Sequence, residues 1–224
     1  MPWRVHDRVD AGRRLAVALA DEAVPDLVVL GLPRGGVPVA AEVARGLSAP
    51  MDVLVVRKLG VPQHRELAMG AIGEGGVRVI DRDVVGAVGA RESVLAGVER
   101  AERELLDRRT SAYREVLASR PLEGHPVVVV DDGMATGSTA RAACEVARAR
   151  GVARVVVAVP VASTSAAGAL SEVADRVVAL STPARFHAVG EFYDDFSPTT
   201  DDEVIRLLAA EAARGPAGSG ATEG

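Results

Sequence analysis

Two adjacent carboxylates, Asp131 and Asp132, directly follow a run of four valines, residues 127–130. A short, continuous run of β-branched residues is typical of a strand that is buried on both faces. A loop of Gly, Ala, Thr and Ser follows the carboxylates, and an alanine-rich helical pattern follows the loop. Backbone N–H groups at the start of a helix bind phosphate, because they are unpaired and the helix dipole favours an anion. Carboxylates accept hydrogen bonds from sugar hydroxyls, so this strand end predicts a site for a sugar phosphate.

The residues from Val127 to Thr139 resemble the 5-phosphoribosyl-1-pyrophosphate (PRPP) motif of type I phosphoribosyltransferases. That motif joins an apolar strand and two acidic residues to a loop, which in this chain runs Asp-Asp-Gly-Met-Ala-Thr-Gly-Ser-Thr. The resemblance implies that Asp131 and Asp132 accept hydrogen bonds from the ribose 2- and 3-hydroxyls of PRPP. The loop would bind PRPP through Gly133 and hold the 5-phosphate through Ala135, Thr136, Gly137, Ser138 and Thr139. A Walker A loop is a poor alternative, because its Gly-Lys-Ser/Thr ending is absent.

The same two aspartates could instead be metal ligands. Two adjacent carboxylates are too few for a Mg²⁺ site built by protein alone, since Mg²⁺ keeps waters and substrate oxygens. The resemblance implies that Mg²⁺ arrives with the pyrophosphate of PRPP, so we expect no direct metal ligand in the chain. Negative charge below the ribose would also stabilise an oxocarbenium-like transition state.

A second candidate loop, Pro33-Arg34-Gly35-Gly36, lies between a predicted strand at 27–32 and a predicted helix at 37–47. Its glycines let backbone amides approach a ligand closely, and Arg34 adds a charge suited to phosphate. Taken alone, the segment is equally well a tight turn with an exposed arginine. By the resemblance it is the first pyrophosphate loop, with Arg34, Gly35 and Gly36 as PRPP contacts. Such loops often hold a strained or cis peptide, which we expect between Arg34 and Gly35.

Arg57 and Lys58 directly follow another predicted strand, at 53–56, and Lys58 is the only lysine in the chain. A lysine is a compact, mobile charge suited to pyrophosphate oxygens, although a solvated surface lysine is the plainer interpretation. Gly60 and Pro62 predict that residues 57–66 form a loop. By the resemblance, this loop closes over pyrophosphate, with Arg57, Lys58 and Arg65 as contacts and His64 as a weaker candidate.

The sequence defines the acceptor base and the general acid or base less well than the PRPP contacts. Ala135 stands where hypoxanthine-guanine enzymes of the resembled family have an aspartate near N7 of the base, which argues against a 6-oxopurine. Any general acid or base must then come from elsewhere. Glu66 is the first candidate, beside Lys58, Asp131 and Asp132 as catalytic residues, and Glu74 is the second. Structural salt bridges explain both glutamates equally well.

Recognition of the base is expected in the C-terminal segment 182–198, which holds all three phenylalanines of the chain. Stacking on a nucleobase is one interpretation of this aromatic cluster, and packing of the segment on the sheet is the other. Phe186 and Val189 are the candidate base contacts.

Alternating strands and helices predict an α/β fold with a mainly parallel sheet flanked by helices, which the resemblance makes the type I phosphoribosyltransferase fold. We expect a domain over 8–212, a helical insertion at about 82–120, a small C-terminal hood at about 182–198 and a disordered tail at 213–224. Dense charge and helical spacing of apolar residues predict one long helix and a preceding short helix within 82–120. The combination resembles an uncharacterised bacterial subgroup with a long helical insertion.

The composition excludes several protein classes. The chain has 224 residues, 48% of them hydrophobic and 3% aromatic, so we expect a core of Val, Leu and Ala. A formal net charge of −5 argues against a general nucleic-acid binder. The single cysteine, Cys144, fits a reducing compartment, and neither a signal core nor a run of spanning length is present. We therefore expect a cytoplasmic protein with no nucleic-acid or membrane partner and, as is common in the resembled family, a homodimer.

These patterns support one leading function and two alternatives. The leading hypothesis is Mg²⁺-dependent transfer of 5-phosphoribosyl from PRPP to a nitrogenous base, with release of pyrophosphate. The first alternative is a non-catalytic sensor of PRPP or nucleotide on the same fold. The second is a hydrolase or pyrophosphorylase that acts on a nucleotide with the same pocket in reverse.

Overall fold

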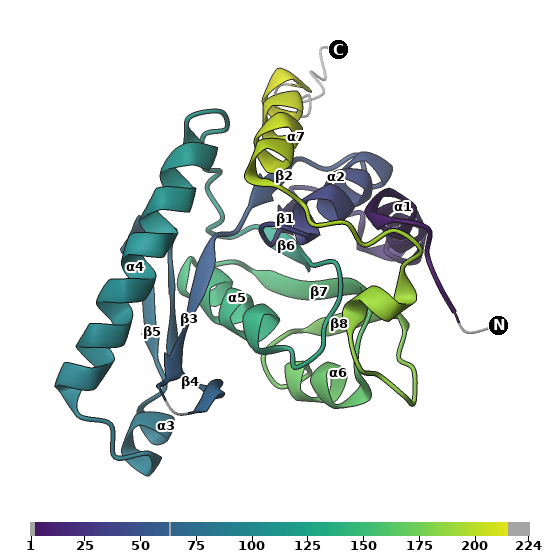
Figure 1. Cartoon of the computed structure of the whole chain (residues 1–224). Helices are drawn as coiled ribbons and strands as arrows, with labels where there is room; N and C mark the ends of the chain where they lie inside the picture. Colours follow the sequence, from purple (N-terminus) through teal and green to yellow (C-terminus); the bar gives the residue numbers. More distant parts are fainter. Residues whose placement is uncertain (1–2, 63, 215–224) are drawn as a thin grey trace.

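The computed structural model describes residues 3–62 and 64–214, without the side chains of residues 65 and 66. Its centre is a five-stranded sheet of order β2-β1-β6-β7-β8 in which every neighbouring pair is parallel (Figure 1). This confirms the predicted α/β fold with a mainly parallel sheet. The strands are β1 (Val28–Gly31), β2 (Met51–Val53), β6 (Pro126–Val130), β7 (Arg154–Val161) and β8 (Arg176–Ser181).

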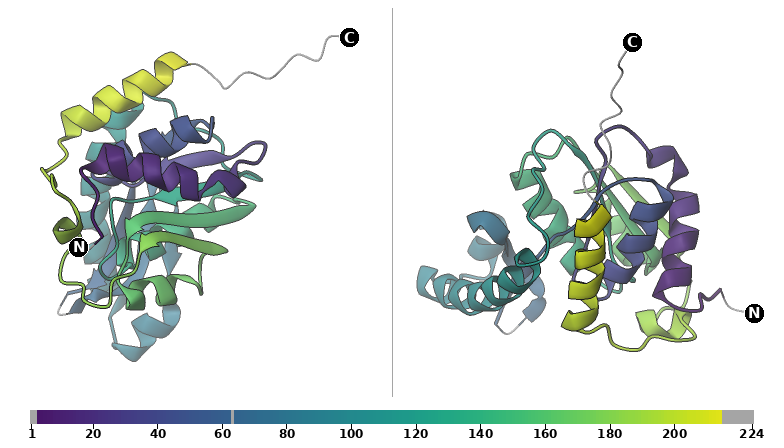
Figure 2. Two further views of the ribbon diagram at one scale, coloured as in Figure 1. Left: turned by 90° about the vertical axis from the view of Figure 1, so that its right-hand side faces the viewer. Right: turned by 90° about the horizontal axis from the view of Figure 1, so that it is seen from above.

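Helices cover both faces of this sheet (Figure 2). On β6, Val128 and Val130 pack in the cluster that contains α1 and α2, whereas Val127 and Val129 pack in the cluster that contains α5 and α6. All four valines are fully buried, which confirms the predicted strand with two buried faces. The helices are α1 (Arg8–Ala18), followed by the short η1 (Ala20–Glu22), then α2 (Gly36–Gly46), α5 (Ser138–Ala149) and α6 (Thr164–Leu170).

A second, antiparallel sheet replaces the loop that was expected at residues 57–66. Its strands are β3 (Val56–Val61), β4 (His64–Gly73) and β5 (Arg78–Ile80), and the short η2 (Glu74–Gly76) joins the last two. The loop prediction was wrong because Gly60 lies at a register shift within the pairing and Pro62 lies in the turn, so neither ends a strand early. The strand expected at 53–56 is likewise divided between β2 and β3.

The predicted pair of helices within 82–120 is confirmed as α3 (Arg82–Ala87) and α4 (Glu92–Arg114). Helix α4 lies along β3 and β4 and contacts α7 (Figure 1). Its buried face carries Leu95, Leu106 and Tyr113. Val94 and Leu105 of the same helix are 39% and 40% exposed, so they lie outside this buried face. No helix in the described part of the chain is long and apolar enough to cross a membrane.

The N-terminal segment meets the segment that precedes the last helix over the carboxyl edge of the sheet. Val5 forms a parallel bridge with Tyr193, which follows the short η3 (Val189–Phe192). The last helix, α7 (Asp201–Arg214), begins after Thr200, whose Oγ1 accepts a hydrogen bond from Glu203 N at 3.1 Å. Thr200 therefore caps this helix. Residues 213 and 214, which were expected to belong to a disordered tail, are the last residues of α7, and residues 215–224 lie outside the described chain.

A buried ion network ties α4 to the central sheet. Asp52 on β2 is fully buried, and its Oδ1 accepts a hydrogen bond from Arg114 Nη1 at 2.6 Å. Arg114 also donates to both oxygens of Glu74, which in turn pairs with Arg150 at the end of α5. Burial raises the pKa of Asp52, while the Arg114 guanidinium opposes that rise. The network joins residues from β2, η2, α4 and α5, a convergence that no local sequence pattern indicates.

We predict that Arg114→Leu lowers the free energy of unfolding by about 3–5 kcal/mol, because it leaves the Asp52 charge buried without its partner. Urea unfolding measures this change. The matched control is Arg103→Leu on the same helix, which breaks a partly exposed pair with Glu99 and should cost at most about 1 kcal/mol. Equal losses in the two variants would contradict the structural role of the network.

Candidate active site

The two loops that were expected to face each other lie side by side at the carboxyl edge of the sheet. Strands β1 and β6 pair in parallel, with Gly31 opposite Val130, and Leu32 N donates to Val130 O at 2.9 Å. The loop after β1 and the loop after β6 therefore leave the sheet from adjacent positions. This is the edge at which ligands bind in open α/β sheets.

The glycines of the first loop make room for the paired aspartates. A Cβ atom placed on Gly35 would lie 1.9 Å from Asp132 Oδ2, and one on Gly36 would lie 2.5 Å from Val130 O and 2.9 Å from Asp131 Cα. A side chain at Gly36 would therefore collide with backbone atoms, and one at Gly35 would have to displace the Asp132 carboxylate. The loop contains a cis peptide bond, but between Pro33 and Arg34 rather than at the expected position one residue later.

Asp131 and Asp132 differ in their contacts. Asp132 N donates to Asp131 Oδ1 at 2.9 Å, whereas Asp132 Oδ2 accepts from Arg8 Nε at 2.9 Å and pairs with Arg8 Nη2 at 2.8 Å. Burial, together with the neighbouring Asp132 carboxylate, raises the pKa of Asp131 well above its ordinary value. Burial also raises the pKa of Asp132, and the Arg8 guanidinium opposes that rise. The strand end therefore holds two carboxylates of which only one has a cationic partner among the described residues.

Arg8 is a site residue that the sequence did not reveal. Its side chain is 12% exposed, its Nη1 donates to Ser197 O at 2.7 Å, and its guanidinium lies 4.2 Å from the centre of the Phe196 ring. Tyr193 Oη donates to Asp132 O at 2.5 Å. The N-terminal helix and the C-terminal segment are thereby both fastened to the second aspartate. Asp132 is 124 residues from Arg8, so no local pattern could have indicated the pair.

The loop after the aspartates ends at the start of α5. Gly137 has φ 76°, a left-handed conformation that favours glycine, and no side chain caps the helix within the described chain. Thr136 Oγ1 and Ser138 Oγ lie 3.1 Å apart, and Lys58 Nζ donates to Ser138 Oγ at 3.1 Å. A cation, two hydroxyls and helix N–H groups thus gather at one point, which is a suitable arrangement for a phosphate.

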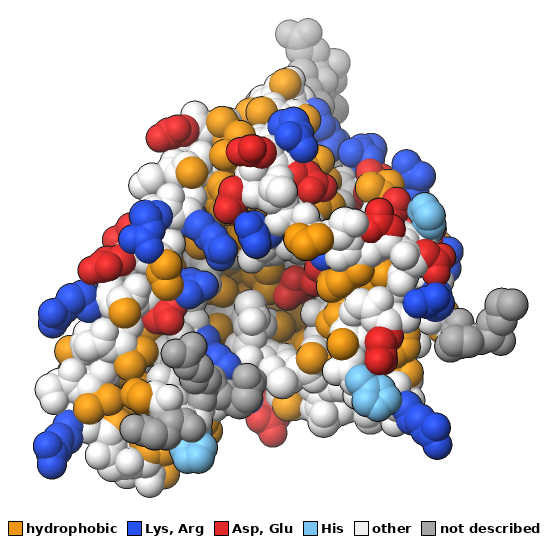
Figure 3. Space-filling model, in the orientation of Figure 1, with side chains coloured by type: hydrophobic (Ala, Val, Ile, Leu, Met, Phe, Trp, Pro, Cys, Tyr) orange, Lys and Arg blue, Asp and Glu red, His pale blue; other side chains and the backbone are white. Residues whose placement is uncertain are grey.

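A cleft of about 540 Å³ adjoins this point. It is lined from four sides: by Pro33 of the first loop, by Arg57 and Lys58 of β3, by Thr139 of α5, and by α4. Its volume lies within the range of about 300–1,000 Å³ that is usual for small-molecule sites. Figure 3 shows a hollow on this face, with Lys and Arg side chains gathered on its upper rim.

The family model for the phosphoribosyl transferase domain matches residues 4–196. The chain belongs to the phosphoribosyl transferase family. Its crystal-structure relative TT1426 from Thermus thermophilus has a TM-score of 0.87 and 46% identity, with 92% of this chain and 98% of that chain covered. The shared architecture confirms the predicted family and fold.

Two sequence relatives are informative. A Mycobacterium tuberculosis protein, named as a candidate phosphoribosyl transferase, is 54% identical over 202 residues, which is 90% of this chain and 46% of that protein. The chain therefore spans about half the length of this relative. The adenine phosphoribosyltransferase of Saccharopolyspora erythraea is 35% identical over 181 residues, covering 78% of this chain and 93% of the relative.

The candidate base contacts have different surroundings. Val189 packs on the loop after β6, since a Cβ placed on Gly133 would lie 2.3 Å from its Cγ1. Phe186 stacks on Phe192, with ring centres 5.4 Å apart, and both belong to the C-terminal segment. Phe192 is buried, so for this ring packing on the rest of the protein is the observed role.

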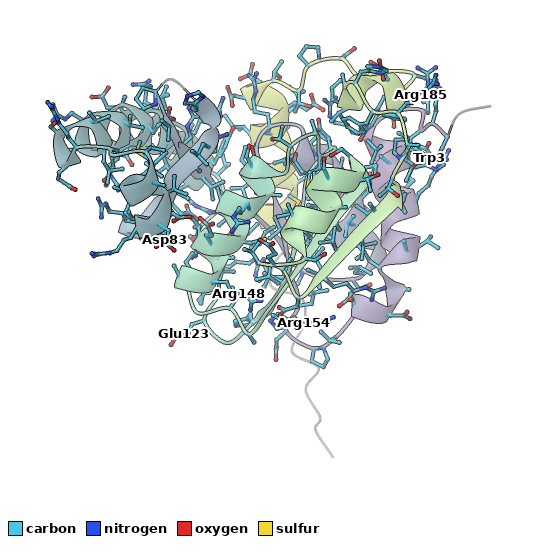
Figure 4. The ribbon with its side chains drawn as sticks, turned by 90° about the horizontal axis from the view of Figure 1, so that it is seen from below. Trp3, Asp83, Glu123, Arg148, Arg154 and Arg185 are labelled. Carbon is cyan, nitrogen blue, oxygen red and sulfur yellow. The ribbon has the colours of Figure 1, made fainter. Side chains whose placement is uncertain are left out.

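Of the two candidate acid–base residues, Glu74 lies far from the candidate site. Glu74 bonds Arg114 and Arg150, and Arg150 is the residue that ends α5. The loop that follows β6 is at the other end of that 12-residue helix, which is about 18 Å long. Figure 4 shows Arg148 and Arg154, near this far end, on the opposite side of the molecule from Trp3 and Arg185. The salt-bridge interpretation therefore holds for Glu74, while the side chains of Arg65 and Glu66 lie outside the described structure.

We predict that Gly35→Ala lowers the free energy of unfolding by about 2 kcal/mol, because the new methyl group must displace the Asp132 carboxylate from Arg8. Gly86→Ala in α3 is the matched control, since a Cβ there meets nothing within 4 Å and alanine favours a helix. Urea unfolding of both variants gives the comparison. A Gly35→Ala protein as stable as the control would contradict the close packing of loop and carboxylate.

We predict that Asp131→Asn stabilises the protein increasingly as the pH rises above about 4. The raised pKa means that folded Asp131 keeps its proton where the unfolded chain has lost it, so wild-type stability falls as pH rises through this window. Asparagine has no proton to lose in this range, so the variant lacks this pH-dependent loss of stability. Melting temperatures from pH 4 to pH 8 test the trend.

Asp175→Asn is the control of opposite sign. Burial favours a higher pKa for Asp175, but the hydrogen bond from Val155 N and the Arg148 pair lower it overall. Its contribution to stability is therefore present at neutral pH and is lost on acidification, so this variant should be less stable than wild type at pH 7 and equal at low pH. Parallel trends in the two variants would refute the assignment for Asp131.

Proposed function

We propose that the protein transfers 5-phosphoribosyl from PRPP to a nitrogen of a base and releases pyrophosphate. The observation that carries this proposal is the contact of Gly35 with Asp132, which brings the candidate pyrophosphate loop against the candidate ribose-binding carboxylates. The bond from Lys58 to Ser138 adds a cation at the adjacent phosphate loop. Family membership supports transferase activity in general.

Each part of PRPP has candidate contacts. The 5-phosphate would bind at the start of α5 through the loop Gly133 to Thr139. A ribose hydroxyl would bind Asp132 Oδ1, since both Arg8 contacts go to Oδ2, and the other hydroxyl would bind Asp131. The pyrophosphate would meet Arg34, Gly35 and Gly36 of the first loop and Arg57 and Lys58 of β3, and Arg65 of β4 remains a further candidate contact.

The proposed reaction breaks the bond between the anomeric carbon and the pyrophosphate oxygen and forms a bond from that carbon to the base nitrogen. Positive charge develops on the ribose as the first bond breaks, and the aspartate pair below the ring stabilises it. Cations around the cleft stabilise the departing negative charge. Closure over the cleft would exclude water, which otherwise hydrolyses PRPP.

Magnesium dependence belongs to the proposal as well. Among the described residues no group of three or more His, Cys, Asp or Glu side chains could hold a metal ion, and Asp132 is already paired with Arg8. This donor set fits Mg²⁺ carried by PRPP better than a site built by the protein. Bound in that way, Mg²⁺ would neutralise charge on the leaving pyrophosphate.

The acceptor base is the finer part of the proposal. Ala135 at the position of the 6-oxopurine aspartate and the relation to an adenine phosphoribosyltransferase both favour a base without a 6-oxo group. Adenine is therefore the first base to test, and Glu66 is the proposed acid–base residue. Phe186 and Val189 are the proposed base contacts. We also propose a cytoplasmic homodimer, for which light scattering measures the mass.

The deciding experiment incubates the protein with PRPP, Mg²⁺ and a panel of bases and measures pyrophosphate release. Release that depends on one base supports the transferase. PRPP binding without release for any base supports the sensor instead. Release from PRPP that no base accelerates indicates hydrolysis, and both of these outcomes would refute the proposal.

We predict that Asp132→Asn and Lys58→Ala each lower turnover by about 10²-fold or more, because each removes a charge that acts on the developing transition state. Arg100→Ala, an exposed arginine on α4 outside the cleft, is the control and should retain wild-type turnover. Circular dichroism verifies folding of each variant. If Asp132→Asn and Lys58→Ala both kept wild-type turnover, the assignment of these residues to the active site would be refuted.

A further inference from the structure

A second cavity, of about 380 Å³, adjoins the cleft on the side of α4 and α7. The two cavities share Arg57 and Arg109 in their linings, so they are neighbours along α4. Arg108, Tyr113 and Asp201 also line the second cavity. None of the loops with a proposed PRPP-binding role contributes Arg108 or Arg109.

The two cavities are cationic within an acidic protein. Their linings contain Arg57, Lys58, Arg108 and Arg109 against the two carboxylates Glu102 and Asp201, whereas the whole chain carries a net charge of −5. Glu102 pairs with Arg57 at 2.6 Å. Arg108 has no hydrogen bond or ion pair with any residue in the described ranges. A cationic excess of this kind attracts a polyanion.

Asp201 links this cavity to the candidate pyrophosphate loop. Its Oδ1 accepts a hydrogen bond from Tyr113 Oη at 2.6 Å and lies 4.0 Å from Arg109 Nε, and its Oδ2 lies 3.4 Å from Arg34 Nη1. The single carboxylate of Asp201 therefore faces two guanidinium groups, and the three groups together carry a net positive charge. Both arginine contacts are long for an ion pair, so either group can turn to a stronger anionic partner at little cost.

We propose that Arg108 and Arg109 of α4 bind the terminal phosphate of the PRPP pyrophosphate. The inference rests on the proposed function and extends it, because it makes α4 a part of the substrate site. Arg34 on one side and Arg109 on the other meet at Asp201, so an anion held by Arg34 lies within reach of α4. A guanidinium group can bind two phosphate oxygens at once, and the side chains of Arg108 and Arg109 both line the second cavity.

The test compares three ligands that differ in the pyrophosphate group. Isothermal titration calorimetry with the full chain and Mg²⁺ measures the Kd of PRPP, of inorganic pyrophosphate and of ribose 5-phosphate. The variants are Arg108→Ala, Arg109→Ala and the double variant, with Arg100→Ala as the matched control on the same helix. Arg108→Ala alters an exposed side chain that has no partner among the described residues, so it preserves the fold.

We expect the double variant to bind PRPP and pyrophosphate at least about tenfold more weakly than wild type. The affinity of each single variant should lie between those of the double variant and wild type. Ribose 5-phosphate should bind all variants within about twofold, since it has no group for α4 to contact. The Arg100→Ala protein should bind all three ligands as wild type does.

Two results would overturn the inference and leave the proposed function standing. In one, the double variant binds PRPP as tightly as the Arg100→Ala protein does. In the other, it loses affinity for ribose 5-phosphate as much as for PRPP, which would assign α4 a general structural role. If wild type binds neither PRPP nor pyrophosphate, the proposed function and the inference fail together.

Discussion

The parallel pairing of β1 with β6 is the constraint on which the site depends. It fixes two loops at adjacent positions and packs Gly35 against Asp132, so that neither loop can change without the other. The four valines of β6 hold that strand in place by packing against helices on both faces. Burial of apolar surface thus determines where the carboxylates lie, although neither of these two carboxylates contributes to the core.

The parts of the structure that were predictable from sequence have local or periodic causes. The valine run, the Asp-Asp-Gly loop and the alanine-rich helix that follows it are continuous in the chain, and each has one favoured conformation. The lone cysteine, Cys144, is buried within the alanine-rich helix α5, and burial raises the pKa of its thiol to about 12. These features required only neighbouring residues for their interpretation.

The parts that were missed depend on contacts between distant segments. Residues 57–66 form a hairpin because β4 and α4 pack against β3, which outweighs the local preference of Gly60 and Pro62 for a loop. Arg8 becomes a site residue only after the N-terminal segment meets residues 192–197 over the sheet. The Asp52–Arg114 pair likewise appears only when α4 reaches β2. For the two ion pairs, the sequence shows the charged residues but not which distant residue each one contacts.

Arginine–carboxylate pairs hold both ends of the candidate site in this structure. Arg8 fastens α1 and the C-terminal segment 182–198 to Asp132 at the proposed ribose end, and Asp201 holds Arg34 and Arg109 at the proposed pyrophosphate end. The first pair is short and shielded, whereas the second set is long and partly exposed. A phosphorylated sugar would compete with the second set far more easily than with the first. Substrate binding should therefore rearrange the α4–α7 side of the cleft while the aspartate end stays in place.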